Sequence, residues 1–206
     1  SRPGWGTDTS VKAWKRKFYC DPKSGFGAAV SMTDNYAIVG AYGVKKAFIF
    51  ARDLSNNQWG TTAVTSITDY DGQAGFGYAV SMTDNYAIVG AYGAKKAFIF
   101  ARDPSTGEWD PTAVASIEGY DGQADFGYAV SMTDNYAIVG AYGAKKAFIF
   151  ARDPSSGEWN TTAVASIEGY DGQAGFGYGS SMTDNYAIVG ALSLIHISEP
   201  TRRTII

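Results

Sequence analysis

The sequence predicts an all-β protein built from repeated units, and two observations lead to that prediction. The first is a segment, FGYAVSMTDNYAIVGAYGAKKAFIF at residues 76–100, which recurs from Phe26 and Phe126 at a constant spacing of 50 residues and begins again at Phe176. A fixed period of this length is typical of repeat architectures. The second is that each unit contains four short apolar stretches separated by turn residues, and none with helical periodicity.

The copies are not equally similar along their length. Residues 76–125 and 126–175 differ at 4 of 50 positions, whereas residues 26–75 differ from 76–125 at 12, mostly between 54 and 69. One segment therefore varies while the motif segment is nearly fixed. Because recent duplication keeps all positions alike, this identity does not by itself indicate a functional site.

Each repeat is expected to form four strands joined by tight turns. In the second repeat the strands are expected at residues 77–83, 86–92, 96–102 and about 112–117. Asp84 and Asn85 are expected to form the first turn, since both tolerate the positive φ that tight hairpins need. Gly93 to Lys95 form the second, and the Pro-Ser-Thr-Gly run beginning at Pro104 is a strong signal for the third.

The strands predict sheets that are covered on both faces. AIVGA and AFIFA are apolar at both alternating sets of positions, whereas a sheet with one wet face would alternate. Four-stranded sheets stacked around an axis meet this condition, and such a sheet is the blade of a β-propeller. Gly90 and Ala91 are interpreted as small residues needed near a crowded axis. The expected repeated core consists of the motif phenylalanines Phe26, Phe76, Phe126 and Phe176 at the blade contacts, with Ile88, Val89, Phe98 and Phe100.

The motif resembles a known repeat. Phe76-Gly77, followed after a strand by the VGA at residues 89–91, is similar to the FG-GAP repeat of integrin-α-type propellers, and the similarity extends over residues 26–191. It implies a non-catalytic binding or adhesion scaffold, part of a larger extracellular or surface protein, with a protein or glycan ligand. Tyr92 stands where the family has its name-giving proline. The Asp84-Asn85 turn is too short for the family's calcium loop, so no cofactor or calcium ion is expected.

The repeat frame divides the chain into segments, and it predicts an open ring. Residues 1–25 are expected to be the remnant of a preceding blade, and residues 192–206 match the translation of a transposase sequencing adapter, which is not native protein. The segments between them are three blades at 26–75, 76–125 and 126–175, and the first half of another at 176–191. Uncovered apolar blade faces are expected to associate with other copies.

Charge and composition disfavour several functions. Residues 26–191 contain 17 acidic and 9 basic residues, and such a surface disfavours nucleic acid as a partner. The single histidine, His196, lies in the adapter-like tail, and Cys20 is the only cysteine, so the usual nucleophilic dyads and zinc sites cannot be built. No apolar run is long enough to span a membrane. An enzyme is disfavoured; the alternative is a carbohydrate-binding or carbohydrate-active propeller that uses Tyr, Trp and carboxylates on one rim.

Strand direction places the second and fourth turns of every blade on one face of the ring. The candidate ligand residues on that face are Lys95, Lys96, Asp121, Gln123, Lys145, Lys146 and Asp171. Mixed charge on hairpins also serves solubility and edge protection, and this interpretation is favoured over a ligand site. Asp121, Gln123 and Asp125 have the alternate spacing of calcium ligands, but the later Glu of such loops is missing and glycine replaces Asp125 in other copies.

Overall fold

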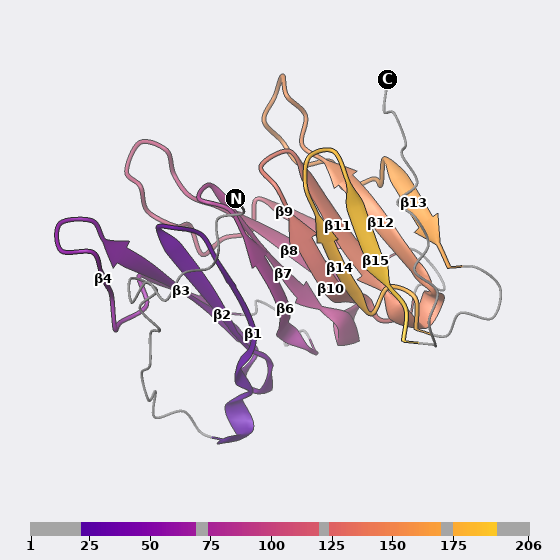
Figure 1. Ribbon diagram of the computed structural model, residues 1–206, viewed down its shortest axis with the longest axis horizontal. Coiled ribbons are helices and arrows are strands. Elements are labelled where there is room, and N and C mark those ends of the chain that lie inside the picture. Colours follow the sequence, from indigo (N-terminus) through magenta and orange to yellow (C-terminus); the bar gives the residue numbers. More distant parts are fainter. Residues whose placement is uncertain (1–21, 69–73, 120–123, 170–174, 193–206) are drawn as a thin grey trace, which may run out of the picture.

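A computed structural model describes residues 22–68, 74–119, 124–169 and 175–192. Three antiparallel sheets follow one another along the chain, and a two-stranded hairpin follows them (Figure 1). The first sheet consists of β1 (Phe26–Met32), β2 (Tyr36–Ala41), β3 (Lys46–Asp53) and β5 (Thr65–Thr68), with β4 (Gln58–Trp59) pairing only with the end of β3.

The second and third sheets repeat this plan. The second contains β6 (Phe76–Met82), β7 (Tyr86–Ala91), β8 (Lys96–Ala101) and β9 (Ala115–Glu118). The third contains β10 (Phe126–Met132), β11 (Tyr136–Ala141), β12 (Lys146–Ala151) and β13 (Ala165–Glu168), and the hairpin contains β14 (Gly179–Met182) and β15 (Ala187–Gly190). Short 3-10 helices are η1 (Pro22–Ser24), η2 (Tyr42–Val44), η3 (Tyr92–Ala94) and η4 (Tyr142–Ala144).

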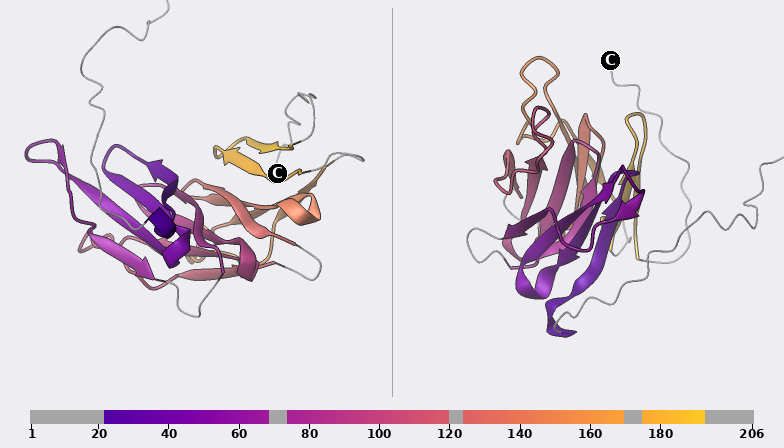
Figure 2. Two further views of the ribbon diagram at one scale, coloured as in Figure 1. Left: turned by 90° about the horizontal axis from the view of Figure 1, so that it is seen from below. Right: turned by 90° about the vertical axis from the view of Figure 1, so that its left-hand side faces the viewer.

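The sheets stack around an axis and form an open arc. The first strands β1, β6, β10 and β14 contact one another in sequence, and each of the last three also contacts the second strand of the preceding sheet. Seen from below, the sheets turn round an open centre, with a gap between the first sheet and the β14–β15 hairpin (Figure 2). The chain is therefore a partial β-propeller, which confirms the predicted fold class.

Each blade has two apolar faces with different residues. We call the face toward the preceding blade the leading face; in the second sheet it carries Phe76, Val80, Met82, Val89 and Phe100. The opposite, trailing face of the first sheet carries Ile38, Ala47, Ile49 and Ile67, and these two sets form one buried cluster. The same arrangement recurs between the second and third sheets. Burial of both faces explains why the AIVGA and AFIFA segments are apolar at both alternating sets of positions.

The motif glycines are needed where neighbouring blades touch. A Cβ on Gly90 would lie 2.1 Å from the carbonyl oxygen of Gly127 in the next blade, and Gly40 and Gly140 meet the next blade in the same way. Gly77 has a φ of +83°, and a Cβ there would lie 2.4 Å from the carbonyl oxygen of Lys46. The predicted crowding at Gly90 is thus real, but it comes from the first strand of the next blade.

The backbone conformation of the first turn in each blade differs from the one expected. Asp84 and Asn85 do connect β6 to β7, but neither is among the described residues with positive φ. The hydroxyl oxygen of Thr83 instead accepts hydrogen bonds from the backbone N–H groups of Asn85 (3.1 Å) and Tyr86 (3.0 Å). A side-chain oxygen that satisfies the turn's amides makes the left-handed conformation unnecessary.

Two strand boundaries also differ. The fourth strand begins at Ala115 instead of about Thr112, because the N–H of Thr112 donates to the Asp110 carboxylate at 2.7 Å and does not join the ladder. Tyr92 belongs to a 3-10 turn and not to the second strand.

The predicted core residues are nearly all buried. Phe76, Phe126 and Phe176 are buried, as are Ile88, Val89 and Phe100, but Phe26 is half-buried because no described blade precedes it. Phe98 is also half-buried, although it packs 5.7 Å from the ring of Phe76. Among the described residues no helix is long and apolar enough to cross a membrane.

Candidate ligand-binding face

The second turn of each blade presents a lysine in a strained conformation. After β7 the chain makes the 3-10 helix η3 and reaches Lys95, whose φ is +56°. The equivalent residues of the first and third blades, Lys45 and Lys145, have φ values of +54° and +55°. The Lys95 N–H donates to the Tyr92 carbonyl oxygen at 3.1 Å, which holds the turn. The side chains of Lys95 and Lys145 are exposed.

The second lysine of each turn is paired with a carboxylate. The ammonium group of Lys96 lies 2.6 Å from Glu118, its cross-strand neighbour, and Lys146 lies 2.5 Å from Glu168. Exposed pairs of this kind contribute about 0–1 kcal/mol to stability. Lys96 and Lys146 therefore each link the third strand of their sheet to the fourth through an exposed ion pair.

The three remaining predicted face residues, Asp121, Gln123 and Asp171, lie outside the described residues. The backbone N–H of Gly119, the residue after β9, donates to the Lys95 carbonyl oxygen at 2.8 Å, so the end of β9 lies beside the lysine turn. Asp125 is described and has a φ of +59°. Among the described residues no group of three or more His, Cys, Asp or Glu side chains could hold a metal ion.

A cluster of tyrosines lies at the inner end of the same face. Tyr78 and Tyr128, on neighbouring first strands, share a hydrogen bond of 2.8 Å between their hydroxyl groups, and their ring centroids lie 4.9 Å apart. Their rings contact the tyrosines of the second turns, with Tyr78 4.7 Å from Tyr92. The tyrosine cluster comprises Tyr42, Tyr78, Tyr92, Tyr128, Tyr142 and Tyr178. It draws rings from all four repeats.

Tyr128 is the centre of this cluster. Its ring contacts those of Tyr78, Tyr92, Tyr142 and Tyr178. Burial raises the pKa of the Tyr128 hydroxyl above the ordinary value of 10.0, and hydrogen bonds with Tyr78 and Tyr178 raise it further. Tyr128 is thus held as a neutral donor and acceptor within the cluster.

The two ends of the cluster are open to solvent. Tyr42 is 40% exposed and Tyr178 is 43% exposed, while the tyrosines between them are half-buried. Exposed aromatic rings held by packed neighbours offer contact area at low entropic cost. The tyrosine cluster and the exposed Lys95 and Lys145 beside it form what we call the tyrosine face.

Sequence reasoning did not find the tyrosine cluster. The signal was present, because Phe76 pairs with Ala91 and the adjacent Tyr78 and Tyr92 must then lie at the same end of the sheet. A bulge between Phe76 and Ala79 shifts the register there, and bulges re-aim side chains.

Of the three tryptophans that could have formed a sugar-binding rim, Trp109 and Trp159 are packed between blades, and Trp59 is half-buried. Trp109 and Trp159 are buried, and each meets a tyrosine of the preceding blade edge-on: Tyr36 at 5.6 Å and Tyr86 at 5.5 Å. Burial between blades favours a structural role for these tryptophans.

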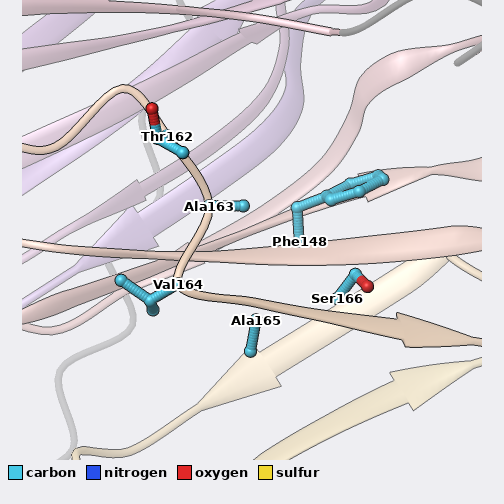
Figure 3. A pocket seen from close by; sticks show the side chains of 6 residues that line it. All are labelled: Phe148, Thr162, Ala163, Val164, Ala165 and Ser166. Atoms are coloured by element: carbon cyan, nitrogen blue, oxygen red, sulfur yellow. The ribbon is translucent and has the colours of Figure 1, made fainter.

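A shallow hollow lies beside the outer strand of the third sheet (Figure 3). It has a volume of about 400 Å³ and is lined by Phe148 and by the segment 162–166. The lining contains aromatic, aliphatic and hydroxyl side chains and no titratable group. A similar hollow of about 490 Å³ includes the equivalent residues Phe48, Thr62, Ala63 and Ser66 of the first sheet. These hollows therefore provide no acid, base or nucleophile other than a hydroxyl.

Comparison with known proteins supports the repeat assignment. Residues 59–107 match the FG-GAP repeat. The match begins at Trp59 in the first blade and ends at Gly107, in the turn after the third strand of the second. The resemblance predicted from the Phe-Gly and Val-Gly-Ala segments is therefore confirmed, and no curated protein sequence matches the chain.

Solved structures with a similar fold are distant in sequence. The computationally designed Ika4 protein has a TM-score of 0.54 at 17% identity, over 82% of this chain and 87% of that one. A protein of Bacteroides fragilis, provisionally assigned as a 6-phosphogluconolactonase, gives 0.56 at 13% identity over 79% and 49%. A streptogramin B lyase gives 0.53 at 10% identity over 82% and 49%. The chain spans about half the length of the last two, and the likeness shows a shared fold alone.

Proposed function

We propose that this chain is a non-catalytic binding scaffold whose ligand contacts the tyrosine face. The observation that carries the proposal is the tyrosine cluster, in which packed tyrosines from all four repeats support the exposed rings of Tyr42 and Tyr178. Tyrosine is enriched in protein interfaces, where its ring buries apolar area while its hydroxyl keeps a polar partner. Lys95 and Lys145 add positive charge beside these rings.

A protein ligand suits this surface best. Its aromatic centre and charged rim match the usual anatomy of a protein interface. A glycan ligand is the alternative, with the tyrosine cluster in place of the tryptophan rim, since Trp109 and Trp159 are buried. Placement of the scaffold outside the cell, as part of a larger surface protein, belongs to the same proposal and rests on the FG-GAP repeat.

Enzyme activity is the less supported candidate. Some structures with this fold are named as enzymes, but 10–13% identity transfers no activity. The described hollows offer only hydroxyl groups, and nucleophilic catalysis needs a base beside the nucleophile.

The test is a binding comparison on printed protein and glycan arrays. The wild-type chain is compared with a Tyr42→Ala/Tyr178→Ala double variant and with Val114→Ala, which alters an exposed apolar residue elsewhere. We expect saturable binding to a protein that the double variant weakens by about 10-fold or more and Val114→Ala leaves unchanged. Binding that the double variant retains in full would contradict the proposal, and binding to glycans alone would favour the alternative.

A further inference from the structure

Both ends of the arc leave a blade face without a covering partner among the described residues. On the leading face of the first sheet Val30 is 66% exposed, whereas its counterpart Val80 in the second sheet is 8% exposed. On the trailing face of the hairpin Ile188 is 70% exposed, whereas its counterpart Ile88 is fully buried. These faces have the composition of the blade interior, and isolated apolar patches of this kind mark interaction surfaces.

The polar contacts at an intact junction are specific. The side chains of Thr33 and Asn35 donate hydrogen bonds to the Asp84 carboxylate of the next blade, the second at 2.7 Å. The next junction repeats this arrangement with Thr83, Asn85 and Asp134. Asp34 occupies the position of Asp84 in the first blade, where it is exposed and receives no hydrogen bond from the described residues. The first blade therefore presents an unused acceptor.

The hairpin presents the matching donors. Thr183 and Asn185 occupy the positions of Thr33 and Asn35 and are exposed. Tyr186 occupies the position of Tyr36, which packs on the tryptophan of the next blade, and is itself exposed. At Gly190 an added Cβ would come no closer than 3.6 Å to any atom, whereas the equivalent glycines meet the carbonyl of the next blade.

The first blade has the complementary backbone site. A Cβ on Gly27 would meet nothing within 4 Å, although Gly77, Gly127 and Gly177 each lie against the backbone of a preceding blade. The carbonyl of Gly27 is the counterpart of the one that faces Gly40 at an intact junction. Each end of the chain thus carries one half of the same junction.

We propose that two copies of this chain associate head to tail, with the trailing face of the β14–β15 hairpin of one copy on the leading face of the first sheet of the other. Asn185 and Thr183 of one copy then donate to Asp34 of the other, and Ile188 packs beside Val30. Head-to-tail contacts form closed rings when the rotation allows. Two copies, each with three sheets and a hairpin, give eight blade positions, six of them full sheets and two of them hairpins, and this number lies within the range of closed propellers.

The hairpin covers only the inner half of the sheet, and this suffices for the junction. The hydrogen bonds and the glycine contact at intact junctions all involve the first two strands of each blade. The outer half of the first sheet has a hollow of about 490 Å³, and the third sheet has an equivalent hollow of about 400 Å³. The third sheet keeps this hollow although its leading face is packed against the second sheet. An outer hollow is therefore compatible with a formed junction.

The experiment is sedimentation velocity of the full chain from low to high micromolar concentration. We expect a monomer that converts to one species of twice the chain mass of 22.0 kDa. Val30→Lys and Ile188→Lys should each weaken association about 30-fold or more, since each places a charge in the apolar contact. The control is Leu54→Lys, which makes the same change at a residue that is 68% exposed and lies on neither face.

A mixture of the two variants tests the direction of the contact. The Val30→Lys chain keeps an intact hairpin and the Ile188→Lys chain keeps an intact first sheet, so their mixture should form a dimer through one junction. Circular dichroism checks that both variants fold, which we expect because both positions are exposed. A wild-type chain that stays monomeric, variants that associate like wild type, a mixture that stays monomeric, or a mass that grows past two chains would each overturn the proposal.

Discussion

The side-chain amide of Asn35 donates a hydrogen bond to the carboxylate of Asp84 across the junction between the first and second blades, at a distance of 2.7 Å. The hydroxyl of Thr33 donates to the other oxygen of the same carboxylate. Hydrogen bonds to a charged group contribute about 1.5–3 kcal/mol. The Asp84 carboxylate, two residues before β7, thereby fixes the position of the second blade relative to the first.

Replacing this carboxylate should weaken the stack. Asp84→Ala is expected to lower the free energy of unfolding by about 1–3 kcal/mol, because Thr33 and Asn35 lose their acceptor. Urea denaturation measures the loss. Asp34→Ala removes the same side chain at the open end of the arc, where it has no donor among the described residues, and should change stability by less than about 0.5 kcal/mol at a chain concentration low enough to keep the protein monomeric. Equal effects of the two variants would contradict the assigned role of Asp84.

The two phenylalanines of β8, Phe98 and Phe100, should contribute differently to the free energy of unfolding. Phe100 is 1% exposed in the cluster between the first and second sheets, so Phe100→Ala should cost about 3–5 kcal/mol. Phe98 is half-buried and should cost less when replaced by alanine, although it packs on Phe76. Denaturation of both variants gives the order. A larger loss at Phe98 than at Phe100 would show that the register of β8 is wrong.

Alkaline pH should destabilise the protein through Tyr128. Burial and the hydrogen bonds of its hydroxyl raise the pKa of Tyr128 in the folded state, so the folded protein keeps a proton that the unfolded chain loses above about pH 10. The stabilising contribution is complete below the unfolded pKa and is lost as pH rises toward the folded one. The melting temperature should therefore fall above pH 10, and Tyr128→Phe should flatten that fall. An unchanged slope in Tyr128→Phe would contradict this.

Calcium should not affect the described blades. Only Thr83, Asp84 and Asn85 lie between β6 and β7, and the Asp84 carboxylate already accepts two hydrogen bonds. The melting temperature should be the same in millimolar calcium and after dialysis against a chelator. A saturable calcium-dependent rise that Asp121→Ala abolishes would disprove this prediction.

The sequence predicted the architecture because the evidence for it is periodic. A spacing of 50 residues and strands apolar at both alternating positions lead to stacked four-stranded sheets whichever residue is considered. The function of individual positions was harder to predict. Gly90 was correctly expected to be sterically required, but its partner, Gly127, lies in another blade, and sequence spacing does not name contacts between blades.

The candidate site was predicted less well than the fold. Lys96 and Lys146 were expected on one face, but their pairing with Glu118 and Glu168 follows from strand register, which turn positions alone do not give. The tyrosine cluster depends on the bulge before Ala79 and on contacts between neighbouring first strands. Both features arise only when blades are assembled. The tail, residues 192–206, was interpreted as translated adapter and lies, apart from Leu192, outside the described residues.

The central claim is that each blade rests on the next through its glycines, and one pair of substitutions tests it directly. A Cβ at Gly90 would lie 2.1 Å from the backbone oxygen of Gly127, whereas at Gly190 the nearest atom would be 3.6 Å away. Equilibrium unfolding in urea should therefore show that Gly90→Ala loses about 1–3 kcal/mol or more, because a backbone carbonyl cannot move aside. Gly190→Ala should lie within about 0.5 kcal/mol of wild type when unfolding is measured at a chain concentration low enough to keep the protein monomeric. A Gly90→Ala variant as stable as Gly190→Ala would contradict the stacked-blade arrangement.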